Sequence, residues 1–182
     1  MHTLSHMAWG VSKHLAFGYL LYSIIHHWRG SSPDWNTVSV LLFATICPDL
    51  IDKPLVFSGF LNYGRGFAHS LLVALPIILF ALFLTRRLNR GELGTAFAIG
   101  YLSHVPVDLY GPLLTGRTTM DTAFLFWPVL VEHSLGIQTP EFWLSRSVLF
   151  LIILFSAFVL WLYDGMPIVA DILRFLTDTR TG

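Results

Sequence analysis

The sequence predicts an all-α helix bundle in a membrane, and two observations support that prediction. Of the 182 residues, 54% are hydrophobic and only 12% are charged, and the mean hydropathy is +0.65. Because soluble domains carry about 25% charged residues, this chain lacks the polar surface to cover itself in water. The second observation is that the apolar residues gather into about five runs. We therefore expect one integral-membrane domain over residues 1–182, with about five transmembrane helices and a metal site near one membrane face.

The apolar runs are separated by short polar, glycine-containing or proline-containing segments. The expected spans cover residues 14–28, 35–51, 69–85, 93–110 and 147–163. The first is somewhat short, because a span usually needs about 20 residues. Pro54 is expected to stop the second helix, since the residue before a proline is pushed out of the helical region. Residues 111–146 form a polar and aromatic excursion, and residues 164–182 form a tail.

Charge and cysteine content exclude some functions. The 11 basic and 11 acidic residues give a formal net charge of +0, so no general electrostatic attraction for nucleic acid is expected. The expected partners are membrane lipids and a lipid or lipid-linked substrate. The single cysteine, Cys47, lies in an apolar run and cannot form an intrachain disulfide.

His104 and Asp108 are the first candidate site residues. They are four residues apart near the end of an apolar segment, so on a helix both side chains share a face and could reach one metal ion. Ionisable residues within apolar segments are costly and are therefore functional candidates. The alternative is a histidine hydrogen-bonded to its neighbouring aspartate as a structural contact.

The other His and Asp residues decide between these alternatives. If each apolar run crosses once, alternation of the ends places six residues at one membrane face: His14, Asp49, Asp52, His69, His104 and Asp108. Arg86, Arg87 and Arg90 then fall on the opposite face. Each of the six alone could be an interfacial residue or a helix cap, but their convergence favours a metal site. The site would lie on the extracytoplasmic side, since compact basic loops such as 86–90 stay inside.

Imidazole and carboxylate ligands suit zinc, and also iron or manganese. We expect a divalent metal, with zinc as the first choice, and one or two ions. Two ions would suit phosphoester cleavage, where they hold the attacking water and the leaving oxygen. Arg65, one helical turn before His69, could contact a phosphate, with Lys53 as a second substrate-binding residue. The alternative for Arg65 is an interfacial anchor. Ser70, Glu132 and His133 are expected to contact the ligands without binding the metal themselves. Glu132-His133 could instead act as a general acid.

The order of these motifs resembles a known family. Pro48-Asp49-Leu50-Ile51-Asp52, Arg65-Gly66-Phe67-Ala68-His69-Ser70 and Gly100-Tyr101-Leu102-Ser103-His104 with Asp108, preceded by His14, resemble the YdjM-like family over residues 10–131. Its members are small multi-pass proteins described as membrane-bound metal-dependent hydrolases, and Asp52-Lys53-Pro54 resembles archaeal members. The family is similar in ligand pattern to the zinc-dependent phospholipase C and single-strand nuclease superfamily.

The resemblance implies an all-helical fold, a metal site formed by the six His and Asp residues, and hydrolysis of a phosphoester by metal-activated water. Asp52, His104 and Asp108 are the residues expected to act in catalysis. Gly64 and Ala68 stand where many members have His and Thr, which favours one ion fewer. Two other functions stay open: a non-enzymatic membrane scaffold or remodelling protein with a structural metal, and a protein that handles metal or haem.

Overall fold

The structure is a computed structural model, and it describes residues 2–62, 64–115, 122–130 and 140–178. Within those ranges the chain forms helices and no strand, which confirms the all-α prediction. The helices are α1 (His2–Trp28), α2 (Trp35–Phe57), α3 (Leu71–Arg87), α4 (Gly91–Thr115), the short 3-10 helix η1 (Ala123–Phe126), α6 (Pro140–Tyr163) and α7 (Val169–Asp178).

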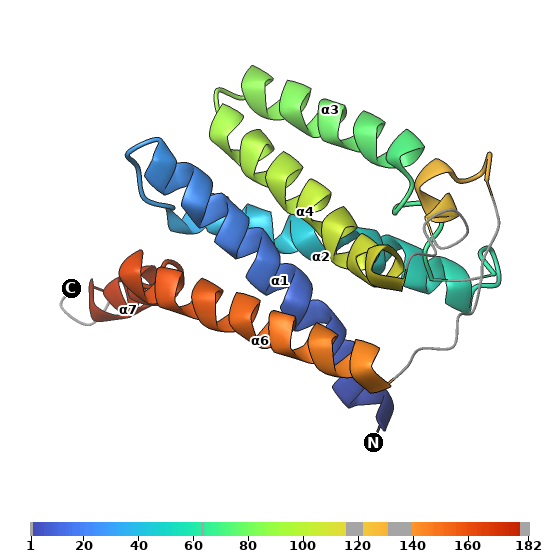
Figure 1. The fold of residues 1–182 in the computed structure, drawn as a ribbon. Coiled ribbons are helices and arrows are strands. Elements are labelled where there is room, and N and C mark those ends of the chain that lie inside the picture. The colour runs from blue at the N-terminus through green and yellow to red at the C-terminus, as the bar shows by residue number, and fades with distance from the viewer. Residues whose placement is uncertain (1, 63, 116–121, 131–139, 179–182) are drawn as a thin grey trace.

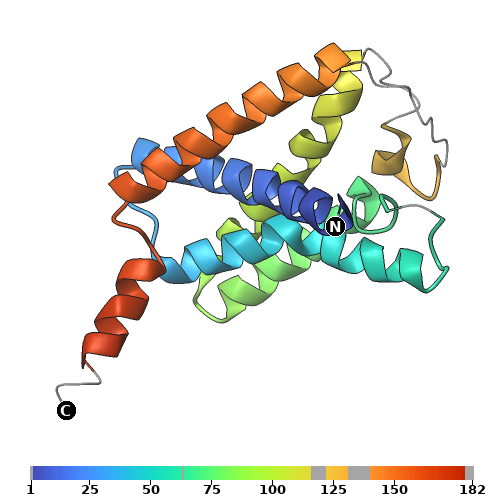
Figure 2. The same cartoon turned by 90° about the horizontal axis from the view of Figure 1, so that it is seen from below.

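The bundle is built around the packing of α2 against α4 (Figure 1). Helix α3 packs on α4, α1 contacts both α2 and α4, and α6 lies along α1. The 3-10 helix η1 lies beside the start of α3. Figure 2 shows α7 leading away from the bundle toward the C-terminus. The three helices that meet in the middle, α1, α2 and α4, are the ones that carry most of the predicted site residues.

Two clusters of buried apolar side chains hold these helices together. The larger joins α1, α2, α4 and α6, and contains Ala16, Tyr19, Tyr22, Val38, Leu41, Ala96 and Ala157. The smaller joins α2, α3 and α4, and contains Ala44, Ala74, Ile78 and Tyr101. The dispersion contacts of these packed side chains hold the helices against one another.

Two glycines allow the central helices to approach closely. A Cβ atom at Gly100 of α4 would overlap the Leu41 carbonyl oxygen and come within 2.9 Å of the Ala44 Cβ. A Cβ atom at Gly18 of α1 would overlap the Thr45 side chain. Gly18 and Gly100 each lie four residues from a predicted ligand, His14 and His104. Their lack of a side chain therefore brings the three ligand-bearing helices together at the level of the site.

Several helices are longer than predicted. Helix α2 runs through Pro48 and Pro54 to Phe57, so the expected stop at Pro54 is wrong. A proline removes one backbone donor, but its carbonyl still accepts, and the Ser58 N–H donates to the Pro54 oxygen at 2.9 Å. Helix α4 continues to Thr115, five residues into the expected excursion, and α6 begins at Pro140 instead of residue 147.

The prediction of about five membrane-crossing helices is not supported by the helices themselves. Among the residues with a described placement, none of the helices is both long enough and apolar enough to cross a membrane.

Candidate metal centre

Five of the six predicted ligands meet in one buried cluster. His14 comes from α1, Asp49 from α2, His69 from the residues just before α3, and His104 and Asp108 from α4. His14, His69, His104 and Asp108 are 3%, 2%, 0% and 4% exposed, whereas Asp49 is partly exposed. Helical spacing explains the α4 pair, because residues four apart share a helix face. The remaining three reach the same point only through the packing of separate helices.

Three ligand atoms of the cluster form a nearly equilateral triangle. The Nε2 atoms of His69 and His104 lie 3.1 Å apart. Each lies 3.3 Å from Oδ2 of Asp108. Ligand distances of about 2.0–2.1 Å in a tetrahedral zinc site imply separations of about 3.3 Å between ligand atoms. The triangle therefore has the dimensions of one face of a tetrahedral metal site.

The hydrogen bonds of the two imidazoles leave their inner nitrogens as acceptors. Nδ1 of His104 lies 2.6 Å from the Thr45 carbonyl oxygen, and Nδ1 of His69 lies 2.7 Å from Oδ2 of Asp52. Both partners are acceptors, so each Nδ1 carries a proton, and in the neutral form of each ring the lone pair is on Nε2. In that form the two Nε2 atoms cannot form a hydrogen bond with each other. A cation bound between them would satisfy both.

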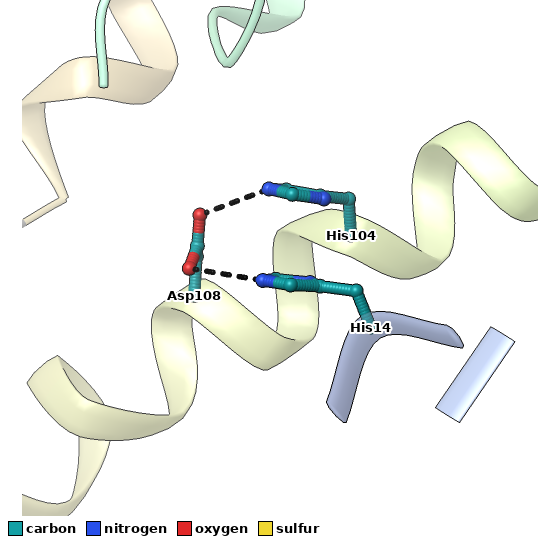
Figure 3. Close-up of side chains that lie close together, drawn as sticks. All are labelled: His14, His104 and Asp108. Atoms are coloured by element: carbon teal, nitrogen blue, oxygen red, sulfur yellow. Dashed lines mark ion pairs between the residues drawn. The ribbon is translucent and has the colours of Figure 1, made fainter. Parts of the chain in front are cut away.

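Asp108 and His14 each contribute a buried side-chain atom that lacks a hydrogen bond within the described part of the chain. Oδ2 of Asp108 and Nδ1 of His14 are buried without a hydrogen bond. An unsatisfied buried carboxylate oxygen is costly, whereas a metal ligand of that type is satisfied. Figure 3 shows the His14 and His104 rings stacked and both directed toward Asp108. Their centroids are 3.7 Å apart, and Nε2 of His14 lies 3.8 Å from Oδ1 of Asp108.

Asp49 approaches the cluster from its open side. Its Oδ1 lies 3.7 Å from Nε2 of His69, and its Oδ2 accepts a hydrogen bond from Lys53 at 2.9 Å. The ligand atoms fall into two groups, His14–His104–Asp108 and Asp49–His69–His104. Because Nδ1 of His104 is held by Thr45, its Nε2 can bind one ion only. A second ion would have to bind without His104, so the donor set fits one ion best.

Asp52 lies behind His69 and not among the converging ligand atoms. Its Oδ1 accepts from the Ala68 N–H at 2.7 Å, and its Oδ2 accepts from the Gly66 N–H at 2.9 Å and from His69. The Tyr101 hydroxyl, which donates to the Ala68 carbonyl at 2.8 Å, holds the same turn from α4. The sequence predicts a metal ligand here, but the fully buried Asp52 uses both oxygens to fix the turn and orient His69.

The two predicted substrate-binding residues lie at the exposed edge of the cluster. Arg65 donates to Oδ1 of Asp108 at 2.7 Å while its side chain stays 42% exposed. Its guanidinium also lies over the Phe124 ring of η1, at 5.9 Å from the centroid. Lys53 pairs with Asp49. These two residues therefore place positive charge where the cluster meets its surroundings.

Ser70 is held between the start of α3 and the segment around η1. Its hydroxyl caps α3 by accepting from the Leu72 N–H, and it donates to the Trp127 carbonyl at 2.7 Å. It thus ties the segment around η1 to the start of α3 and makes no contact of its own with the ligand atoms. Glu132 and His133 lie outside the described residues.

Sequence reasoning missed a second polar cluster at the other end of α1. Oδ2 of the buried Asp164 accepts from the Tyr19 and Ser23 hydroxyls at 2.6 and 2.7 Å, and Oδ1 lies 2.6 Å from Nε2 of His27. The signal was present, because Tyr19, Ser23 and His27 recur every four residues and form a polar stripe on one face of α1. The missed supports of the metal cluster, the Thr45 carbonyl and Phe124, give no such signal.

A comparison of the chain with known protein families finds a match. The model of the family described as YdjM inner membrane protein matches residues 7–170. No curated protein and no solved structure matches the chain.

Proposed function

Because the chain belongs to the YdjM inner membrane protein family, we propose that it is a membrane-bound metal-dependent hydrolase acting on a phosphoester of a lipid or lipid-linked substrate. One observation carries the proposal. Oδ2 of Asp108, a buried carboxylate oxygen without a hydrogen bond, lies 3.3 Å from Nε2 of both His69 and His104, beside a half-exposed arginine. The carboxylate and imidazole atoms suit a divalent cation, and the arginine suits a phosphate.

The outer surface of the bundle supports contact with lipid. Helices α3 and α6 expose many large apolar side chains, a pattern that marks membrane or protein contacts when it is contiguous. On α3 and α6 they include Leu72, Leu75, Leu79, Phe80, Phe83, Leu151, Ile152, Phe155, Phe158 and Leu162. A substrate that is itself a lipid would reach the cluster from the phase that covers these faces.

His69, His104 and Asp108 would hold the ion, with His14 and Asp49 as further ligands. Zinc is the first choice for this mixture of imidazole and carboxylate, ahead of iron and manganese. A divalent ion there supplies Lewis acidity toward a phosphoryl oxygen and toward water. Thr45 and Asp52 fix the tautomers of His104 and His69, so both rings present Nε2 to the cation.

The basic residues at the edge would select the substrate. The Arg65 fork is held by Asp108 and Phe124, so it is preorganised for a phosphate oxygen without a large loss of side-chain entropy. Lys53, held by Asp49, adds a second positive charge on the same side. The predicted position of this edge on the extracytoplasmic side belongs to the same proposal. Labelling of single cysteines placed in residues 86–92 and 111–146 in intact cells tests it.

A structural metal in a non-enzymatic membrane scaffold is the second candidate. The near-complete burial of His14, His69, His104 and Asp108 favours it, because structural zinc sites are closed whereas catalytic sites keep an open position. On this alternative the ion joins α1, α4 and the residues just before α3, and removal of a ligand lowers stability without abolishing any turnover.

Purified protein in detergent distinguishes the two functions. Bound metal is measured by elemental analysis, and phosphodiesterase and phosphomonoesterase activities are measured on lipid substrates. We expect a divalent metal and activity in the wild type, and loss of both in His104→Ala and Asp108→Ala. His26→Ala is the matched control, because the His26 side chain lies at the far end of α1 from the cluster, where it contacts Ser31 and the Tyr22 ring. Metal-free wild-type protein whose cluster variants behave like the control would overturn the proposal.

A further inference from the structure

An apolar cavity lies beside the metal cluster, between α1, α4 and α6. Its volume is about 220 Å³. Its walls include Phe17 of α1, Val107 of α4, and Leu149, Phe150 and Ile153 of α6, and among the described lining residues Lys13 is the charged one. The cavity contains none of the five converging ligands. Its chemistry therefore differs from that of the cluster: the described lining offers mainly hydrocarbon contacts, with the Lys13 ammonium and the Tyr110 hydroxyl as polar groups.

The cavity and the cluster share the same turns of two helices. Lys13 directly precedes His14 on α1, and Val107 directly precedes Asp108 on α4. Adjacent residues of an α-helix point about 100° apart. Each of these turns therefore directs one side chain into the metal cluster and the next into the cavity wall. A molecule with an anionic group at the cluster would have the cavity as the nearest apolar space.

We propose that this cavity binds the aliphatic chain of a lipid phosphoester whose phosphate lies at the cluster; the proposal rests on the proposed function. Such a lipid has a single chain or enters the cavity chain first. The apolar lining suits an aliphatic chain, because such a chain needs no hydrogen-bond partners and packs against hydrocarbon side chains. Lys13 and Arg65, which come from separate parts of the chain, provide positive charge near the junction with the phosphate. The substrate class follows as an amphiphile with an anionic phosphoester directly next to an aliphatic chain.

The test uses a probe that binds but cannot be hydrolysed. The full chain in lipid nanodiscs is photolabelled with a dodecylphosphonate that carries a diazirine at the end of its chain, and labelled residues are located by mass spectrometry. We expect the label around Leu149–Ile153, with protection by unlabelled dodecylphosphonate and none by methylphosphonate at the same concentration. Equal protection by methylphosphonate would overturn the proposal, because the tail would then contribute nothing.

Cavity-filling variants give a second readout. Ile153→Trp and Leu149→Trp place a large ring in the cavity, and we expect at least a tenfold loss of labelling with unchanged metal content. Val148→Trp is the matched control, because Val148 is exposed on the same helix. If one cavity variant fails to fold, the other decides. Labelling that persists at the wild-type level in a folded cavity variant would overturn the proposal.

The labelling needs no turnover, so the two proposals fail separately. Labelling of the cavity without any hydrolysis would overturn the hydrolase function and leave the chain site standing. Hydrolysis of lipid phosphoesters at equal rates in wild type and Ile153→Trp would overturn the chain site alone.

Discussion

Asp108 divides its two oxygens between different tasks. Oδ1 accepts from Arg65, whereas Oδ2 faces the Nε2 atoms of His69 and His104 without a hydrogen bond. The neighbouring Asp52 also uses both oxygens, but on backbone amides and His69. The two aspartates therefore differ in role because their partners differ: Asp108 remains available to a cation, and Asp52 orients the ligand His69.

The first prediction concerns Asp52. Asp52→Asn keeps the shape of the side chain but removes the charge that holds the Nδ1–H of His69. Outer partners of metal ligands typically contribute 10–100-fold to metal affinity, and we expect a loss in that range. Competition with a chelating dye measures it. His69→Ala should lose metal altogether, and an Asp52→Asn variant with wild-type affinity would contradict the positioning role.

The second prediction concerns the cap of α2. Asp34 accepts from the backbone N–H groups of Asn36 and Thr37 and from the Thr37 hydroxyl. Partial burial alone would raise the pKa of Asp34, but these hydrogen bonds outweigh it and hold the pKa below its usual value. The cap's contribution is therefore present above the unfolded pKa and is lost as the pH falls through the folded pKa.

Asp34→Ala should lower the free energy of unfolding by about 1 kcal/mol near neutral pH, and by less in acid. Thermal melts over a pH series measure the difference. Asp34→Asn is the control, because asparagine is an equally good cap without a titrating group. A difference between wild type and Asp34→Ala that stays constant into acid would contradict the assignment.

At the scale of elements, close approach of helices builds the site. Gly100 lets α4 lie against the Leu41 carbonyl and Ala44 of α2, one turn before His104. Gly10 of α1, in contrast, has open space where a Cβ would be. Gly100 and Gly10 therefore allow the effect of the same Gly→Ala substitution to be compared in two helices.

We expect Gly100→Ala to destabilise the chain by about 1–3 kcal/mol, because the added methyl group forces α2 and α4 apart. Gly10→Ala should be neutral or stabilising, by up to about 1 kcal/mol, since alanine has the higher helix propensity. Chemical or thermal unfolding in detergent measures both. Equal effects of the two substitutions would show that the close approach contributes no stability.

At the scale of the molecule, two polar clusters tie the helices together at separate places. The metal cluster joins α1, α2, α4 and the turn before α3, and the Asp164 cluster fastens the end of α6 to α1. Asp164→Ala leaves two hydroxyls and an imidazole without their shared acceptor. We expect a loss of several kcal/mol, because hydrogen bonds to a charged group are worth about 1.5–3 kcal/mol each.

Thermal unfolding measures that loss, with Asp171→Ala as the control. Asp171 pairs with Arg174 on the exposed surface of α7, and such pairs contribute about 0–1 kcal/mol. Metal content should be unchanged in both variants. A melting temperature of Asp164→Ala within the error of the control would contradict the fastening role.

Metal removal tests the other cluster. A ligand that binds only the folded state stabilises it by about 2.7 kcal/mol at a free concentration of 100 times Kd, so chelation should lower the melting temperature. His104→Ala, which lacks a central ligand, should melt at the same temperature with and without chelator. If the wild-type melting temperature is the same with and without chelator, the cluster binds no metal with useful affinity.

The sequence alone determined the helical class, because apolar runs follow directly from residue order, and its six candidate ligands include the five that meet. It could not separate Asp49 from Asp52, since residues three apart share a helix face and look equivalent as ligands. The tertiary structure decided between them: the turn at residues 66–69 brings its amides to Asp52, while Asp49 is left facing His69. It also decided the roles of Ser70 and Asp164, because their partners are distant in sequence and only packing brings them together.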